Sequence, residues 1–140
     1  MANYNAKFLT NYFSVTDAIK FKNIIGSCHA DDEIEIYEKK QLDGSIKYSF
    51  GCIGIIYGIS ENDDDCEEDI ELFYTSLQSI IASDDAIIIT EIGNEKLNYF
   101  TACCIIITCD DIKSIDVRNE AVKLAATMLK TPDFTTQMDY

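Results

Sequence analysis

Three segments of this chain are apolar at successive positions, and they limit the folds that it can adopt. They are Gly51-Cys-Ile-Gly-Ile-Ile-Tyr57, Ala86-Ile-Ile-Ile89 and Ala102-Cys-Cys-Ile-Ile-Ile107. Extended segments of this kind are typical of strands whose two sides are both covered by other parts of the protein. The sequence therefore predicts a sheet with interior strands and with cover on both of its faces.

Segments with the apolar periodicity of helices lie between and around these strands in the sequence. After a first strand over residues 4–15, a helix is predicted from Ser14 or Thr16 to about Ser27, with its apolar residues at helical spacing. A second helix is predicted over residues 67–82, and a third runs from Ser114 or Asp116, either of which can cap it, to about Lys130. Each helix carries one apolar stripe, so each is expected to pack on a neighbouring element.

Two hairpins complete the predicted fold, one over residues 31–50 with an Asp43-Gly44 turn and one over residues 85–108 with a Gly93-Asn94 turn. We predict an α+β two-layer sandwich with a five-stranded, mostly antiparallel sheet and helices packed on it. Two pseudo-repeated helix-hairpin units and a C-terminal helix would form a single domain over residues 1–140. Either the third helix or the second subunit of a homodimer is expected to cover the other face.

The charge of the chain is strongly asymmetric. Its net charge is −14, and twelve Asp or Glu residues occur from Glu61 to Glu95 without any Lys or Arg. With 47% hydrophobic and 11% aromatic residues, the chain is not a disordered acidic tail. Nucleic acid and anionic membranes require a basic surface, so neither is expected as a direct ligand. A basic protein partner is predicted instead.

The predicted partner-binding residues are the acids of two segments, one at the start of the first hairpin and one that leads into the second helix. They are Asp31, Asp32, Glu33, Glu61, Asp63, Asp64, Asp65, Glu67, Glu68 and Glu71. Acids in the first turn of a helix also interact favourably with the helix dipole.

No catalytic residue, cofactor or metal site is predicted. The six cysteines lack CxxC spacing, and the single His29 leaves no paired zinc-ligand motif. Asp63-Asp64-Asp65 resembles the start of a calcium loop, but Glu68 and Tyr74 stand where Gly and Glu are required, which leaves only weak, nonspecific divalent binding open. His29 beside Cys28 reads as a loop histidine rather than a nucleophile pair. The Asp84-Asp85 and Asp110-Asp111 pairs read as solvated turns rather than acid-base pairs.

A cytoplasmic location is expected for this chain. No apolar run is long enough to cross a membrane, and the first residues lack the pattern of a signal peptide. Free thiols are also typical of a reducing compartment.

Three short motifs carry a resemblance. Met1-Ala-Asn-Tyr4 with Thr10-Asn-Tyr-Phe13, Gly93-Asn-Glu-Lys-Leu-Asn-Tyr99 and Phe134-Thr-Thr-Gln-Met-Asp-Tyr140 resemble small acidic proteins of Firmicutes conjugative elements and phages. In size and charge the chain is also similar to anti-CRISPR and anti-restriction DNA mimics. This likeness implies an inhibitor of a nucleic-acid-handling host defence protein. The alternatives are an immunity protein or antitoxin for a basic toxin, a charge that serves only solubility, and a small enzyme.

Overall fold

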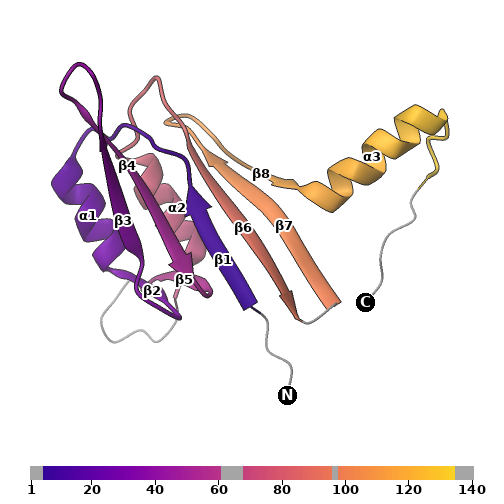
Figure 1. Cartoon of the computed structure of the whole chain (residues 1–140), viewed down its shortest axis with the longest axis horizontal. Helices are drawn as coiled ribbons and strands as arrows, with labels where there is room; N and C mark the ends of the chain where they lie inside the picture. The colour runs from indigo at the N-terminus through magenta and orange to yellow at the C-terminus, as the bar shows by residue number, and fades with distance from the viewer. Residues whose placement is uncertain (1–4, 61–67, 96–97, 135–140) are drawn as a thin grey trace.

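The computed structural model describes residues 5–60, 68–95 and 98–134 and is dominated by one antiparallel sheet of six strands (Figure 1). Their order is β3-β4-β1-β6-β7-β8, and every neighbouring pair is antiparallel. The strands are β1 (Asn5–Thr10), β3 (Glu35–Lys40), β4 (Ile46–Ile53), β6 (Ile87–Glu95), β7 (Asn98–Ile107) and β8 (Ile112–Asp116). A separate two-stranded sheet pairs β2 (Cys28–Ala30) with β5 (Ile56–Ile59), and the helices are α1 (Ala18–Gly26), α2 (Ile70–Gln78) and α3 (Val117–Leu129).

The prediction of an α+β fold is confirmed, but the five-stranded sheet with two helix-hairpin units is wrong. The segment 51–57 does not continue as one strand, because Gly54 adopts φ +122° and ends β4 before β5 begins. β5 then leaves the main sheet and pairs with β2. Nothing equivalent follows the second hairpin in the described chain, where residues 112–116 add β8 to the main sheet instead.

The two hairpins differ in how well the sequence located their turns. The first is confirmed, since β3 and β4 pair around Gly44, which adopts φ +89°. The second turn was placed too early, because Gly93 and Asn94 belong to β6 and the pairing of the hairpin extends to Glu95 and Asn98. A strand continues through a turn-prone pair when ladder hydrogen bonds outweigh local preference.

Helices α1 and α2 cover one face of the main sheet and lie behind it in Figure 1. Asp17, rather than the predicted Ser14 or Thr16, caps α1 and accepts a hydrogen bond from the amide of Lys20 at 3.0 Å. Asp69 caps α2 in the same way. The strand residues that face the helices are buried together with the apolar sides of α1 and α2, and this layer forms the core.

The other face of the sheet has no helix over it in the described chain (Figure 1). The prediction that the third helix covers this face is wrong, because α3 projects away from the sheet and none of its residues is buried. Of the two predicted caps, Asp116 is confirmed by hydrogen bonds from the amides of Arg118 and Asn119. Among the described residues, no helix has both the length and the apolar content that a membrane span requires.

Candidate acidic binding surface

The predicted partner-binding acids lie in two segments of the structure. Asp31, Asp32 and Glu33 follow β2, and Glu68 and Glu71 flank the start of α2. The remaining predicted residues lie outside the described residues; they are Glu61, Asp63, Asp64, Asp65 and Glu67. The geometry of the surface therefore comes from the first five.

The small β2–β5 sheet brings these two acidic segments together. His29 of β2 pairs with Gly58 of β5, and Ile59 of β5 forms an isolated bridge with Asp69. That bridge consists of two backbone hydrogen bonds of 3.1 and 2.9 Å between Ile59 and Asp69. The residues after β2 and the first residues of α2 thus lie on the two sides of one strand, although they are almost forty positions apart in the sequence.

Asp31 is fixed by three hydrogen bonds to β5 and the residue before it. Its carboxylate accepts from the Tyr57 hydroxyl at 2.6 Å and from the Ile55 amide at 2.9 Å, while its own amide donates to the Ile55 carbonyl. The Tyr57 hydroxyl, together with the Ile55 amide, holds the pKa of the Asp31 carboxyl below its usual range. Asp31 is therefore ionised throughout the physiological pH range.

The Tyr57 hydroxyl interacts with residues of both acidic segments. Its pKa is raised chiefly by its hydrogen bond to Asp31, and the negative charge of Glu68 raises it further. Glu68 also lies 4.0 Å from Nδ1 of His29. Asp31, Tyr57, His29 and Glu68 consequently form one exposed cluster, which we call the acidic cluster.

No lysine or arginine in the described part of the chain forms an ion pair with the five acids of this region. The described lysines that form ion pairs do so with other acids. The pairs are Lys22 with Glu38, Lys47 with Asp85, Lys113 with Asp111, and Lys123 with Glu120. The only ion pair that the described chain gives to these acids is the long contact between His29 and Glu68. Within the described residues, the negative charge of these five acids is thus not neutralised by lysine or arginine.

The other polar candidates of the sequence have structural roles. His29 lies in β2 rather than in a loop, and burial raises the pKa of the neighbouring Cys28 thiol to about 12, so this thiol is not an activated nucleophile. Asp111 accepts from the amide of Ile112 and lies 3.6 Å from Lys113. Within the described ranges, no three Cys, His, Asp or Glu side chains are grouped so that they could hold a metal ion.

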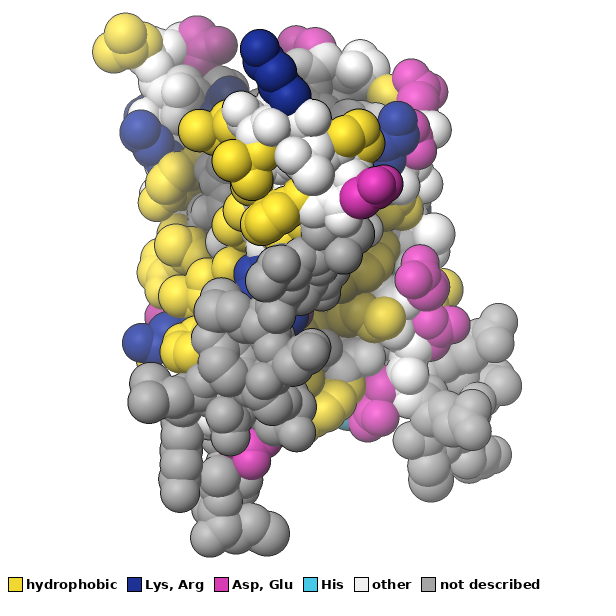
Figure 2. Space-filling view, turned by 90° about the vertical axis from the view of Figure 1, so that its right-hand side faces the viewer, with side chains coloured by type: hydrophobic (Ala, Val, Ile, Leu, Met, Phe, Trp, Pro, Cys, Tyr) yellow, Lys and Arg dark blue, Asp and Glu magenta, His cyan; other side chains and the backbone are white. Residues whose placement is uncertain are grey.

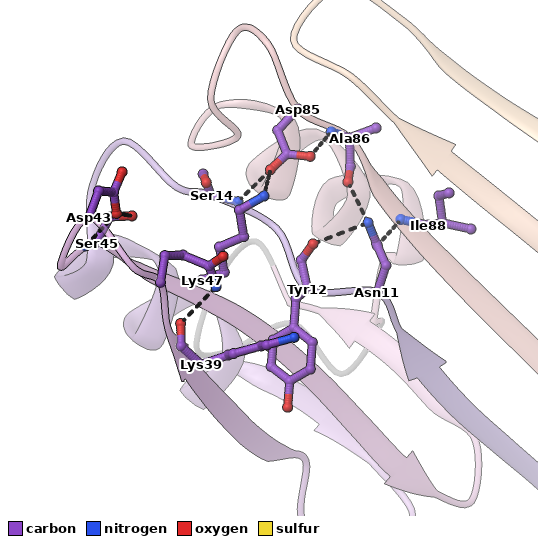
Figure 3. Close-up of polar contacts among 11 residues, drawn as sticks. Asn11, Tyr12, Ser14, Lys39, Asp43, Ser45, Lys47, Asp85, Ala86 and Ile88 are labelled. Carbon is purple, nitrogen blue, oxygen red and sulfur yellow. Dashed lines mark hydrogen bonds and ion pairs between the residues drawn. The ribbon is translucent and has the colours of Figure 1, made fainter.

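Asp85 links β4 to the segments that follow β1 and precede β6, and so is more than a solvated turn residue (Figure 3). Its carboxylate accepts from the amides of Ser14 and Ala86, each at 2.8 Å, and lies 3.7 Å from Lys47 Nζ. Nearby, the Asn11 side chain donates to the Ala86 carbonyl and accepts from the Ile88 amide. These contacts fasten the end of β1 to the start of β6.

The sequence did not predict one surface feature, a groove on the uncovered face of the main sheet. It encloses about 680 Å³ and is lined by side chains of β1, β3, β4 and β6 and by the segment before β3. Its lining includes Lys7, Leu9, Ile53 and Ile92 together with Asp32, Glu33 and Glu35. The alternation of β1, in which Ala6 and Phe8 are buried while Lys7 and Leu9 are exposed, is the sequence signal that could have indicated it.

Comparison of the chain with known protein families, with curated proteins and with solved structures finds no match.

Replacing Tyr57 with phenylalanine is expected to raise the pKa of Asp31 toward its ordinary value of 3.8, because the strongest hydrogen bond to the carboxylate is lost. A lowered carboxyl pKa stabilises the fold at pH values above the unfolded pKa, and this stabilisation is lost as the pH falls through the folded pKa. The variant should therefore show a smaller decline in stability below pH 3.8. An NMR titration of the Asp31 carboxyl carbon measures the pKa directly.

Tyr37→Phe is the matched control for this titration. The Tyr37 hydroxyl donates to Glu35 at 2.7 Å on β3, so its removal deletes an equivalent hydrogen bond at another site. The pKa of Asp31 should be unchanged in this variant. An Asp31 pKa that stays low in Tyr57→Phe would show that the hydroxyl is not its main cause.

Proposed function

We propose that this chain is an acidic inhibitor that binds the basic surface of a nucleic-acid-handling protein, of the kind that acts in host defence. The observation that carries the proposal is the convergence of two acidic segments at the acidic cluster, without an ion-paired lysine or arginine among the described residues. A binding role of this type requires no catalytic residue or cofactor. We propose that the chain acts in the cytoplasm, where such targets are found.

The electrostatics of nucleic-acid binding explain why such a surface can inhibit. Duplex DNA carries a negative charge about every 1.7 Å along its axis, and proteins that bind it present grooves lined with Lys and Arg. Carboxylates fixed on a folded surface can occupy the same groove and exclude the nucleic acid. The net charge of −14 would speed association with a basic partner, and the binding would weaken steeply with added salt.

Fixed carboxylates are better suited to this role than mobile ones. Asp31 is held in place by Tyr57 and Ile55, and Glu68 directly precedes the capping residue of α2. A charge that is already positioned loses less conformational entropy when it is bound. The acidic cluster is therefore expected to contribute more to binding than an equal number of acids on flexible side chains elsewhere.

The first experiment is a pull-down from a host lysate on the immobilised full chain at low and at raised salt. Recovery of a nuclease or a nucleic-acid-binding complex at low salt supports the proposal. Recovery of a small basic toxin supports the alternative of an immunity protein or antitoxin. If nothing basic is retained at either salt concentration, the charge serves solubility and the proposal is wrong.

The variant Asp31→Asn/Glu68→Gln/Glu71→Gln is expected to weaken binding of the captured partner by about 10- to 100-fold, because three exposed charge contacts are lost and each changes the affinity by a few-fold. Isothermal titration calorimetry at several salt concentrations measures the loss. The dependence of the affinity on salt should also decrease, since fewer ionic contacts form.

The control variant Asp84→Asn/Asp110→Asn/Glu120→Gln removes the same number of exposed negative charges at a distance from the acidic cluster. It should keep most of the affinity. Equal losses in the two variants would show that total charge, rather than this cluster, determines binding.

A further inference from the structure

The uncovered face of the main sheet, which we call the open face, has exposed apolar side chains on its central strands, with Lys7 and Thr90 among them. Its outward side chains come from β1, β4, β6 and β8; the exposed aliphatic ones are Leu9, Ile53, Ile88, Ile92 and Ile115. Ile53 is 71% exposed although it lies inside a regular strand pair. Figure 2 shows hydrophobic side chains gathered on the left of the view, where the open face lies, and Asp and Glu mainly on the right. A water-exposed apolar surface of this extent marks an interaction site.

Helix α3 has a second apolar surface, which no described residue buries. Val117, Ala121, Leu124 and Met128 recur at helical spacing on one side of it, and Leu124 and Met128 are 61% and 75% exposed. The helix has 13 residues and none is buried. Isolated helices of about 12–15 residues are only marginally stable in water, and helices in proteins are stabilised mainly by packing of an apolar side. α3 therefore requires a surface to pack on.

In the structure, α3 does not lie on the open face of its own sheet (Figure 1). Asp116 is the last residue of β8, where it pairs with Cys103 of β7, and it is also the N-cap of α3. No linker separates the strand from the helix, and both cap hydrogen bonds of Asp116 fix the direction in which the helix leaves. α3 consequently extends beyond the edge of the sheet instead of turning back across it (Figure 1).

The two surfaces match in their apolar character rather than in charge. α3 carries Arg118 and Lys123 together with Glu120, and the groove on the open face is lined by Lys7 as well as by Asp32, Glu33 and Glu35. An apolar stripe on a helix and an apolar groove are therefore both present on every copy of the chain.

We propose that two copies of the chain form a symmetric dimer in which α3 of each copy packs on the open face of the other. Stable interfaces bury about 800 Å² from each partner. Five open-face aliphatic side chains and three on the stripe of α3 are exposed in each chain; the three are Val117, Leu124 and Met128. At about 100 Å² for each side chain, they supply roughly 800 Å² per copy, which is enough for a stable dimer.

Size-exclusion chromatography with light scattering on the full chain tests the proposal. The chain should elute as a dimer with twice its mass of 15.8 kDa. Leu124→Glu on α3 and Ile53→Glu on the open face should each raise the dimer dissociation constant by about 100-fold, because a charge would be buried in an apolar contact. Ile19→Glu on α1 is the control, since Ile19 is 75% exposed and lies on neither surface; it should leave the dimer intact. Circular dichroism verifies that all three variants are folded.

Mixing the two interface variants distinguishes helix exchange from other dimers. A copy with Leu124→Glu keeps a normal open face, and a copy with Ile53→Glu keeps a normal α3, so one of the two contacts can form between them. An equimolar mixture should therefore give a heterodimer that neither variant forms with itself. Three results would overturn the proposal. The wild type could be monomeric, Leu124→Glu could weaken the dimer no more than Ile19→Glu does, or the mixture could stay monomeric. A monomer that both variants destabilise equally would place α3 on its own sheet and would also overturn it.

Discussion

Gly58→Ala is expected to destabilise the fold by more than about 3 kcal/mol, because two separate costs fall on one residue. Gly58 adopts φ +116°, a conformation that residues with a Cβ rarely adopt. A Cβ at this position would also collide with the backbone carbonyl group of Asp69 and the amide nitrogen of Ile70. Backbone atoms cannot move aside as a flexible side chain can, so β5 and the start of α2 would have to separate. Urea unfolding followed by circular dichroism measures the change.

Gly44→Ala measures the cost of the backbone conformation without the cost of a collision. Gly44 also has a positive φ, of +89°, but a Cβ there would meet nothing within 4 Å. The loss should therefore be only about 1 kcal/mol, the cost of the backbone conformation alone. If both variants lost the same stability, the close approach of β5 to α2 would not matter.

The same contact connects the fold to the proposed function. The acidic cluster depends on Ile59 bridging to Asp69, and Gly58 is the residue that permits this approach. Gly58→Ala should thus separate Glu68 from His29 even under conditions in which the rest of the chain is folded. Binding of a basic partner should fall with it, although no acidic residue has been changed.

The features that the sequence predicted correctly depend on local contacts. The Asp43-Gly44 turn, the Asp116 cap and the α+β class follow from residues close together in the chain. The error in the strand count came from residues 51–57, which read as one buried strand. Gly54 interrupts it with a φ of +122°, and the side chain of Asp31, more than twenty positions earlier, lies where a Cβ on Gly54 would stand. Such a long-range contact leaves no periodic pattern.

The acidic cluster was predictable only in part for the same reason. Its acids stand out in the sequence as two separate runs, but their meeting depends on the pairing of β2 with β5 and on the bridge from Ile59 to Asp69. Tyr57 and His29 gave no sequence signal of a role in it. The open face shows the converse case, since the apolar runs predicted cover on both sides of the sheet, while α3 does not provide that cover and no other described helix lies there.

Phe50→Ala is expected to cost about 3–5 kcal/mol, because Phe50 is at the centre of the aromatic core. Its side chain is 0% exposed, and its ring centroid lies 6.3 Å from those of Phe13 and Phe21 and 5.9 Å from that of Phe73. These rings come from β4, from the segment after β1, from α1 and from α2. Truncation would leave a cavity between the sheet and both helices, and partial collapse cannot fill it without moving an element.

Tyr37→Ala tests whether burial, rather than the loss of an aromatic ring, causes this effect. Tyr37 lies on the neighbouring strand β3, but its side chain is 40% exposed on the open face, so its truncation should cost less than about 1 kcal/mol. Because folded domains are stable by only about 5–15 kcal/mol, Phe50→Ala should lower the melting temperature by roughly 10 °C or more while Tyr37→Ala changes it little. Equal shifts would mean that the open face is packed as tightly as the core, and the proposed docking of α3 from a second copy would then be the first explanation to test.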